Sequence, residues 1–214
     1  MAQGSRWLVM ALVLAGLTAR ADADIFKVFG EAHGGAVGGK GLSGDPVDAG
    51  PDDEAFFANV PHLAYGARIG ARFLILEGAI QHHQFASGSR LSTWTQFAVG
   101  VGLQPELGDE KARKEHTGGF VEAGVDVGFG LGTGQQVDPP LSNDEITDKA
   151  FLIEGRFGFG KHLNKVLDIG LVVPVSWGYF IKNGFDTPAN DVSNHYKGLQ
   201  VEGLLYLRLN IKLL

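Results

Sequence analysis

The sequence predicts an all-β protein that forms one eight-stranded antiparallel transmembrane β-barrel. Three observations lead to this fold class. Apolar and polar residues alternate with a period of two along most of the chain, which is typical of strands with two different faces. Gly accounts for 32 of the 214 residues, which is about twice ordinary usage and disfavours helix interiors. Short and long connections follow one another between the alternating segments, as in membrane barrels.

The first 23 residues have the form of an export signal. Arg6 precedes the apolar run Trp7–Leu17, and Ala21 and Ala23 fit the small-residue rule for cleavage. We therefore expect residues 1–23 to be a signal peptide and residues 24–214 to form the barrel. An N-terminal membrane anchor is the alternative, but the apolar run is short for a span of about 20 residues.

Eight segments alternate in this way, and each is long enough to cross a membrane as a tilted strand. The last segment is the clearest, because Leu, Ile and Val dominate one of its faces and polar residues occupy most of the other face. An even strand number is typical of bacterial single-chain barrels, and closure pairs the backbone polar groups that lipid would leave unpaired. The predicted strands are Ile25–His33, Phe56–Gly70, Phe73–Phe85, Leu91–Leu103, Phe120–Leu131, Ala150–Phe159, Val166–Phe180 and Leu199–Leu213.

The connections differ in length and composition. Tight periplasmic turns are predicted at Gly70–Arg72 and Gly160–Lys165, and a third periplasmic connection, Gln104–Gly119, is long, charged and expected to hold a helical turn. Pro174 lies within a strand and predicts a bulge, because Pro cannot donate a ladder hydrogen bond. The predicted outer loops are Gly34–Ala55, Ala86–Arg90, Gly132–Lys149 and Ile181–Asn194.

The leader, the eight alternating strands, the asymmetry of the loops and the terminal strand together resemble the small eight-stranded outer-membrane proteins of the OmpA, OmpX and OmpW type. The resemblance extends over residues 24–214. It implies a bacterial outer membrane as the location, with membrane lipid and lipopolysaccharide as the surroundings of the outer wall.

The inward face carries charged residues of both signs. An eight-stranded barrel is only wide enough for side chains to fill it, and buried charges need partners. We therefore expect a structural charge network, in which Arg68 pairs with Glu77, and Arg156 pairs with Glu122 or Asp126. The predicted members are Arg68, Glu77, Glu122, Asp126, Glu154, Arg156, Glu202 and Arg208. Outward aromatic residues predicted to lie at the membrane interfaces are Phe151, Phe159, Trp177 and Tyr179.

No metal site and no cofactor is predicted. His33, His62 and His83 face inward on adjacent strands, which leaves a metal or pH-sensing cluster open, but their spacing matches no ligand motif. The glycine run at residues 34–41 lacks the Ser or Thr with which a phosphate-binding loop holds Mg²⁺. Without cysteine, disulfides and thiol catalysis are excluded, and a net charge of −6 gives no reason to expect nucleic acid as a partner.

The leading functional hypothesis is a non-enzymatic outer-membrane barrel with a polar, charge-paired lumen. It would present its long outer loops for envelope integrity or for binding a surface ligand. A small channel for ions or small apolar solutes is the alternative, because inward glycines leave free volume. A soluble lipocalin-like barrel would instead turn its apolar face inward. A lipid-modifying enzyme would need a Ser-His-acid set, and His82 with Ser87 and Ser89 lacks a positioned acid.

Overall fold

The computed structural model describes residues 25–43, 62–87, 90–136, 146–187, 190–193 and 196–213. The predicted signal peptide, residues 1–23, and parts of all four predicted outer loops lie outside these residues. Eight long strands make up the wall: β1 (Phe26–Ser43), β2 (His62–Phe73), β3 (Leu76–Ser87), β4 (Arg90–Leu103), β6 (Gly119–Gln136), β7 (Ile146–His162), β8 (Leu167–Thr187) and β10 (Tyr196–Lys212). Three short elements complete the described fold: β5 (Glu106–Leu107), α2 (Glu110–Glu115) and β9 (Asn190–Ser193).

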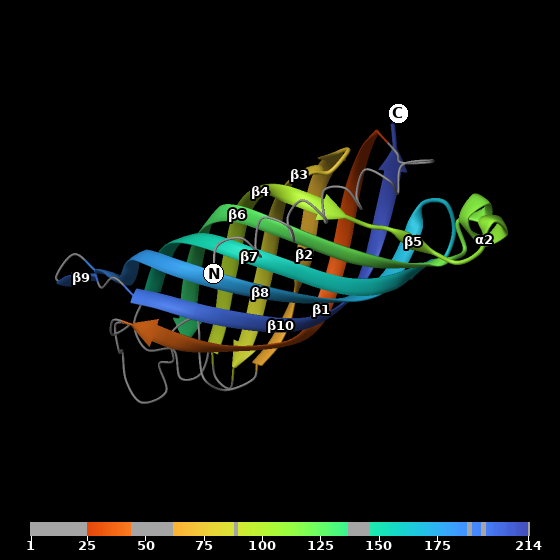
Figure 1. The fold of residues 1–214 in the computed structure, drawn as a ribbon. Helices are drawn as coiled ribbons and strands as arrows, with labels where there is room; N and C mark the ends of the chain where they lie inside the picture. The colour runs from red at the N-terminus through yellow and green to blue at the C-terminus, as the bar shows by residue number, and fades with distance from the viewer. Residues whose placement is uncertain are drawn as a thin grey trace, which may run out of the picture.

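The sheet closes because its first and last long strands pair with each other. Each strand runs antiparallel to its neighbours, and β10 pairs with both β1 and β8 (Figure 1). If each residue is followed to its pairing partner on the next strand, the path that starts at Ala150 of β7 runs once around the barrel. It comes back to β7 at His162, twelve residues further along the chain. This stagger is the shear that tilts the strands of a closed barrel. The predicted eight-stranded antiparallel barrel is confirmed.

The two ends of the barrel differ. β5 and α2 lie at one end, which we call the turn end, and β9 lies at the opposite end, the loop end (Figure 1). The helical turn predicted in the charged connection is α2. Its first turn is capped by Asp109, whose Oδ1 accepts a hydrogen bond of 2.8 Å from the backbone N–H of Ala112. In the described part of the chain, no helix is long and apolar enough to span a bilayer.

The first strand is longer than its sequence pattern predicts. β1 continues from the predicted end at His33 to Ser43, so the glycine run of the predicted first loop is largely strand. Glycine suits this place because β1 and β10 approach closely. A Cβ atom on Gly35 would collide with the backbone carbonyl of Gly203 across the pair.

Two further local predictions are wrong. The turn between β2 and β3 lies at Leu74 and Ile75 rather than at Gly70–Arg72, and Leu74 takes a left-handed φ of 56° there. Pro174 causes no bulge: the pairing of β8 with β10 keeps the same register on both sides of it, from Val201–Val175 to Leu204–Val172. In the pairing of β8 with β7, the register shift lies instead between Lys149 and Ala150.

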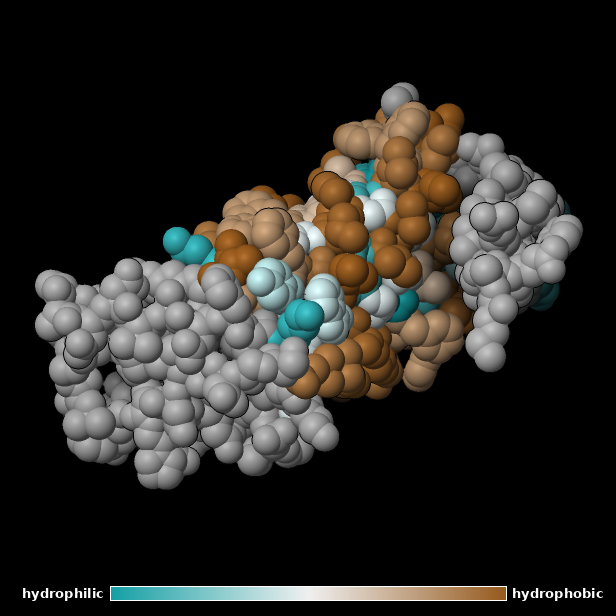
Figure 2. Space-filling model, turned by 60° about the vertical axis from the view of Figure 1, so that its left-hand side comes forward, coloured by the Kyte–Doolittle hydropathy of each residue, from teal (hydrophilic) through white to brown (hydrophobic). Residues whose placement is uncertain are grey.

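Compared with a soluble protein, the wall of the barrel has the opposite distribution of apolar and charged side chains. Most large apolar side chains on the outer face are 40–68% exposed, whereas charged and amide side chains in the lumen are buried. Figure 2 shows hydrophobic side chains over most of the coloured surface. On β7 the outward apolar positions run from Phe151 to Phe159, between the exposed Lys149 and Lys161. This length of nine residues matches a tilted strand that crosses a bilayer.

Candidate functional site: the lumen of the barrel

Glu77 is the centre of the charge network on the turn side of the lumen. Its Oε1 accepts hydrogen bonds of 2.7 Å from Arg68 and from Arg156, and its Oε2 accepts from Arg72. The structure thus brings Arg68 and Glu77 together across the β2–β3 hairpin. All four side chains are at least nine-tenths buried, so the guanidinium groups compensate a carboxylate that has little access to water.

Two further carboxylates extend this network. Asp126 lies 2.8 Å from Arg156 and 3.2 Å from Arg68. Arg156 was predicted to pair with Glu122 or Asp126, and the structure places it against Asp126. Glu122 is bound by Arg208, at 2.7 Å, and Arg208 also lies 2.7 Å from Glu31. The predicted residues Arg68, Glu77, Asp126 and Arg156 therefore form one group, and Glu122 with Arg208 forms a second.

Aromatic rings join these two groups. The guanidinium carbons of Arg68 and Arg208 lie 5.5 and 5.7 Å from the centre of the Phe29 ring. Arg208 also lies 4.4 Å from the centre of the Tyr206 ring. Such cation–π contacts gain strength where water is excluded. Phe29 thus fills the space between the two arginines that organise the network.

Charges on the turn side of the lumen are balanced. Inside the exposed Lys212, which shares the inward face of β10 at the rim, the described basic residues are Lys27, Arg68, Arg72, Arg156 and Arg208, and the described acidic residues are Glu31, Glu77, Glu122, Asp126 and Asp168. Five positive groups therefore face five carboxylates. A balanced set limits the penalty for burying charge, so this half of the lumen is suited to a structural role.

The loop side of the lumen is held by amides, hydroxyls and imidazoles. Glu154 accepts hydrogen bonds from Ser176 at 2.9 Å and from Gln96 at 3.4 Å. Glu202 accepts one of 2.6 Å from Gln200 and lies 3.3 Å from His83. Glu154 and Glu202, the two remaining predicted network members, are therefore separate from the arginine groups. Among the described residues, the one contact between them is a 3.7 Å approach of Arg156 to Glu154.

Two of the three inward histidines meet in this region. The rings of His33 and His83 stand 4.7 Å apart, because Gly66 between them has no side chain. The side chain of His62 lies outside the described residues. Across the described ranges, no three His, Asp or Glu side chains are already arranged as a metal centre.

The inward glycines make room for neighbouring side chains. A Cβ on Gly102 would meet Arg72 and Glu77, one on Gly124 would meet Arg156, and one on Gly130 would collide with the Trp94 ring. The pocket between Gln81 and Glu202 has a volume of only about 10 Å³, at the lower limit for one water molecule. Side chains therefore occupy the space beside these three glycines.

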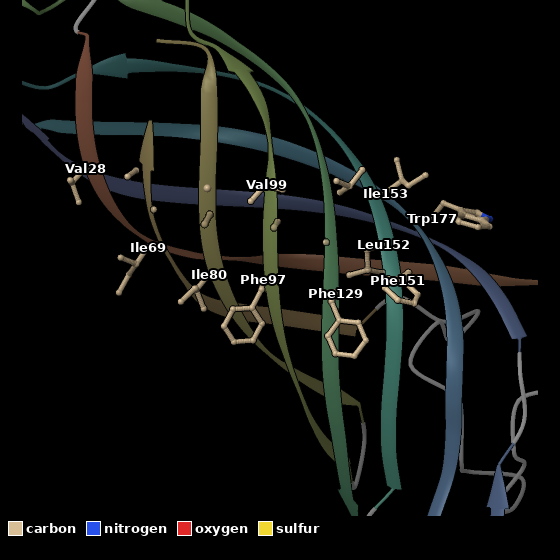
Figure 3. A pocket seen from close by; sticks show the side chains of 17 residues that line it. Val28, Ile69, Ile80, Phe97, Val99, Phe129, Phe151, Leu152, Ile153 and Trp177 are labelled. Atoms are coloured by element: carbon tan, nitrogen blue, oxygen red, sulfur yellow. The ribbon is translucent and has the colours of Figure 1, made fainter. Parts of the chain in front are cut away.

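The predicted interface aromatics lie on the outer wall. Phe151 and Phe159 are more than half exposed, and Trp177 and Tyr179 are partly exposed. Phe151 and Trp177 line a pocket on this wall, together with outward Val28, Ile69, Ile80, Phe97, Val99, Phe129 and Ile153 (Figure 3). No described lining residue is charged, so this groove is an apolar part of the outer wall.

The outward His82 has a hydroxyl neighbour. Its Nδ1 lies 2.9 Å from the Thr95 Oγ1, and no described carboxylate joins the pair. The side chain of Ser87 and the whole of Ser89 lie outside the described residues.

Several lumen residues were missed in the sequence. Arg72 was assigned to a turn, although its inward position follows once the turn is moved to Leu74 and Ile75. The alternation places Gln81, Gln96 and Gln200 on the inward face, but the predicted charge network leaves them out because they carry no charge.

Comparison with known proteins found similarity only among solved structures. No protein-family model and no curated protein matches the chain. Neisserial surface protein A, NspA, is 9% identical, with 88% of this chain and 97% of that chain covered and a TM-score of 0.47. Ail, the attachment invasion locus protein of Yersinia pestis, is 8% identical over 88% and 100%, with a TM-score of 0.39. The outer membrane protein OprG from Pseudomonas aeruginosa is 14% identical over 87% and 96%, with a TM-score of 0.34.

The architecture follows from the coordinates of the chain itself. Its eight long strands close without a free edge, its apolar side chains face outward and its charged side chains face the lumen. This combination is expected of a barrel surrounded by lipid. The protein therefore has the architecture of the small eight-stranded outer-membrane β-barrel proteins.

Proposed function

We propose that the protein is a non-enzymatic barrel of the bacterial outer membrane with a closed lumen. It acts through its outer surface, where the long connections at the loop end contribute to envelope integrity or bind a surface ligand. The observation that carries this proposal is the filling of the lumen by paired charges and rings. A lumen of this kind stabilises a scaffold and leaves no wide path for solutes.

Packing at both ends of the lumen supports the closed state. Trp94 and Phe180 stand 6.0 Å apart inside the barrel and are buried, with Val37 and Phe85 in the same apolar cluster. At the turn end, the ring of the fully buried Phe120 lies 4.8 Å from the ring of His162, centre to centre. The ion pairs around Glu77 lie between these apolar layers, so a solute would have to displace charged groups from their partners.

The outer wall supports membrane lipid and lipopolysaccharide as the surroundings of the barrel. Apolar side chains extend around the described strands, and exposed lysines end the apolar stretch of β7 on both sides. A lysine at the membrane boundary extends its ammonium group toward water or lipid phosphate. The same wall facing water would expose far more apolar area than soluble monomers do.

A small channel is the competing function. The inward glycines suggested it, and the side chains that occupy their volume weigh against it. The proposed absence of enzymatic activity is supported by the surroundings of His82, whose described partner is the hydroxyl of Thr95. A hydrolytic triad would also require a carboxylate that orients the imidazole.

Planar-bilayer conductance tests the proposal. The protein would be folded from urea into detergent, checked for different migration of boiled and unboiled samples, and added to a bilayer that contains lipopolysaccharide. A general porin in the same bilayer is the positive control. We expect folded protein without discrete conductance steps. Reproducible steps from the folded protein, absent when it is boiled first, would contradict the closed lumen and establish the channel.

The loop-end role needs a separate cellular test. The protein would be compared with variants in which residues 44–61 or 137–145 are replaced by short Gly-Ser linkers. We expect both variants to reach the membrane as folded barrels and to lose the protection or surface binding that the complete protein provides. Full activity in a variant lacking both segments would contradict a function of the loop end.

A further inference from the structure

The loop side of the lumen buries two carboxylates that lack a full positive partner. The side chains of Glu154 and Glu202 are each 3% exposed. Arg156, whose shortest contacts are to Glu77 and Asp126, approaches Glu154 only to 3.7 Å. Among the described side chains, Glu202 forms no ion pair with a lysine or an arginine. Two negative charges without compensation are strongly unfavourable in a lumen from which water is excluded.

Two imidazoles lie against carboxylates in the same region. Nδ1 of His83 is 3.3 Å from Oε2 of Glu202, and Nδ1 of His33 is 3.4 Å from Oε1 of Glu31. Both histidine side chains are 1% exposed. Their ring centres are 4.7 Å apart, and Gly66 leaves the space for this approach, since an added Cβ would lie 3.0 Å from Nε2 of His33. A proton on either ring turns its contact into an ion pair.

Unpartnered atoms in this region provide a second observation. Within the described structure, the buried atoms without a hydrogen-bond partner include both ring nitrogens of His33, Nδ1 of His83, Oε1 of Glu154 and Oε2 of Glu202. Such atoms are unfavourable unless something satisfies them, and a bound proton makes a nitrogen or a carboxyl oxygen a donor. The amide of Gln81 contacts Nε2 of His83. It suits both protonation states, because an amide offers either an N–H or an oxygen.

The charged groups that face this region from other strands already have partners. Among the described residues they are Glu31, beside the imidazoles, and Arg68, Asp126 and Arg156, which act on Glu154. All four take part in ion pairs of the turn side. The positive charge that Glu154 and Glu202 lack must therefore come from protons bound in the region itself.

We propose that His33, His83, Glu154 and Glu202 form one proton-binding cluster, which takes up two protons when the barrel folds and releases them at alkaline pH. Seven described carboxylates face five lysine and arginine side chains inside the rim of the lumen, so two protons bring it to neutrality. Sites that interact this closely share their protons. The inference rests on the proposed closed lumen, because water in an open lumen would compensate the carboxylates directly.

The cluster makes the stability of the barrel depend on pH in one direction. In an unfolded chain, glutamate loses its proton near about pH 4.3 and histidine near about pH 6.5. Above that range the folded barrel holds up to two protons more than the unfolded chain, so rising pH favours unfolding. In mild acid the unfolded histidines are protonated too, and the difference becomes small. The loop side is therefore held most tightly in mild acid and loosens at alkaline pH.

Urea unfolding in vesicles of zwitterionic lipid, from about pH 6 to about pH 9, tests the cluster. The equilibrium constant for unfolding should rise about tenfold per pH unit for each proton released, and so up to about a hundredfold. The double variant Glu154→Gln/Glu202→Gln removes the carboxylates that need the protons. It should lose most of this slope and unfold less readily than the wild type at about pH 9. Two controls carry the same substitution: Glu77→Gln should unfold more readily than the wild type, and the exposed Glu115→Gln should keep the slope of the wild type.

A gain of stability in the double variant cannot come from damage to the fold, so the expected result is specific. A flat profile of the wild type, or an unchanged slope in the double variant, would overturn the cluster. Bilayer conductance at about pH 6 separates this failure from that of the proposed function. A silent barrel with a flat profile would contradict the cluster alone, whereas discrete conductance steps at this pH would contradict the closed lumen and the cluster with it.

Discussion

At the scale of single residues, Glu77 has the most demanding surroundings in the lumen. Three guanidinium groups, from Arg68, Arg72 and Arg156, contact one carboxylate that is 1% exposed. Each arginine has few alternative partners, and Asp126 is shared by two of them. Loss of the negative charge at this point would leave buried positive charges without compensation.

We predict that Glu77→Gln lowers the free energy of unfolding by about 3–5 kcal/mol, the usual effect of removing one partner from a buried ion pair. Urea unfolding in lipid vesicles measures it. The control is Glu115→Gln, the same chemical change at an exposed position on α2, which should stay within about 0.5 kcal/mol of the wild type. Equal effects of the two substitutions would show that the network contributes nothing to stability.

Glycines have different roles on the two faces of the wall. Gly130 faces the lumen and leaves space for the Trp94 ring, whereas Gly155 faces outward with nothing within 4 Å of an added Cβ. We predict that Gly130→Ala destabilises the barrel by about 1–3 kcal/mol, because an overpacked interior must shift. Gly155→Ala should change the free energy of unfolding by less than about 0.5 kcal/mol. The same urea experiment compares them, and a reversed order would contradict the assigned faces.

At the scale of strands, period-two alternation identified the faces better than the ends. Inward and outward positions on β6, β7 and β10 agree with the sequence pattern, because a residue's face is decided locally by the pleat. The C-terminal end of β1 could not be found in this way. Its second half is rich in glycine, and it remains a strand because β10 and β2 pair with it on either side.

Turn positions and ion-pair partners also required the structure. The β2–β3 turn at Leu74 and Ile75 contains neither Gly nor Pro, so it carried no sequence signal. The partner of Glu122 is Arg208, at a sequence separation of 86 residues. Such a pair depends on the shear of the whole barrel, and no local pattern contains that information.

Depth along the outer wall gives a prediction for a single strand. Val127 lies midway along β6, paired with Val99 and Ile153, which also face outward. We predict that Val127→Arg destabilises the barrel in lipid by about 2–4 kcal/mol, whereas Leu107→Arg, on exposed β5 at the turn end, costs at most about 1 kcal/mol. Urea unfolding from vesicles provides both values. Equal costs would contradict a lipid-facing band centred on Val127.

At the scale of the whole molecule, closure of the sheet and filling of the lumen depend on each other. Staggered pairing closes the wall and brings Glu31, Arg208 and Glu122 together from three strands. The side chains that meet inside then hold the strands in register. The composition and alternation of the sequence predicted the barrel, but the proposed closed lumen depends on how glycines and large side chains face each other across strands.

Single-cysteine labelling tests most directly whether the lumen is closed and the wall faces lipid. The chain has no cysteine, so Ser176→Cys probes the lumen, the neighbouring Val175→Cys probes the outer wall, and Glu115→Cys probes α2. Folded vesicles would be treated with a water-soluble cationic methanethiosulfonate, with urea-unfolded samples as the control for reactivity. We predict rapid labelling at position 115 alone, and labelling of all three after unfolding. Rapid labelling of folded Ser176→Cys would show an open lumen, and rapid labelling of folded Val175→Cys would show a wall in contact with water.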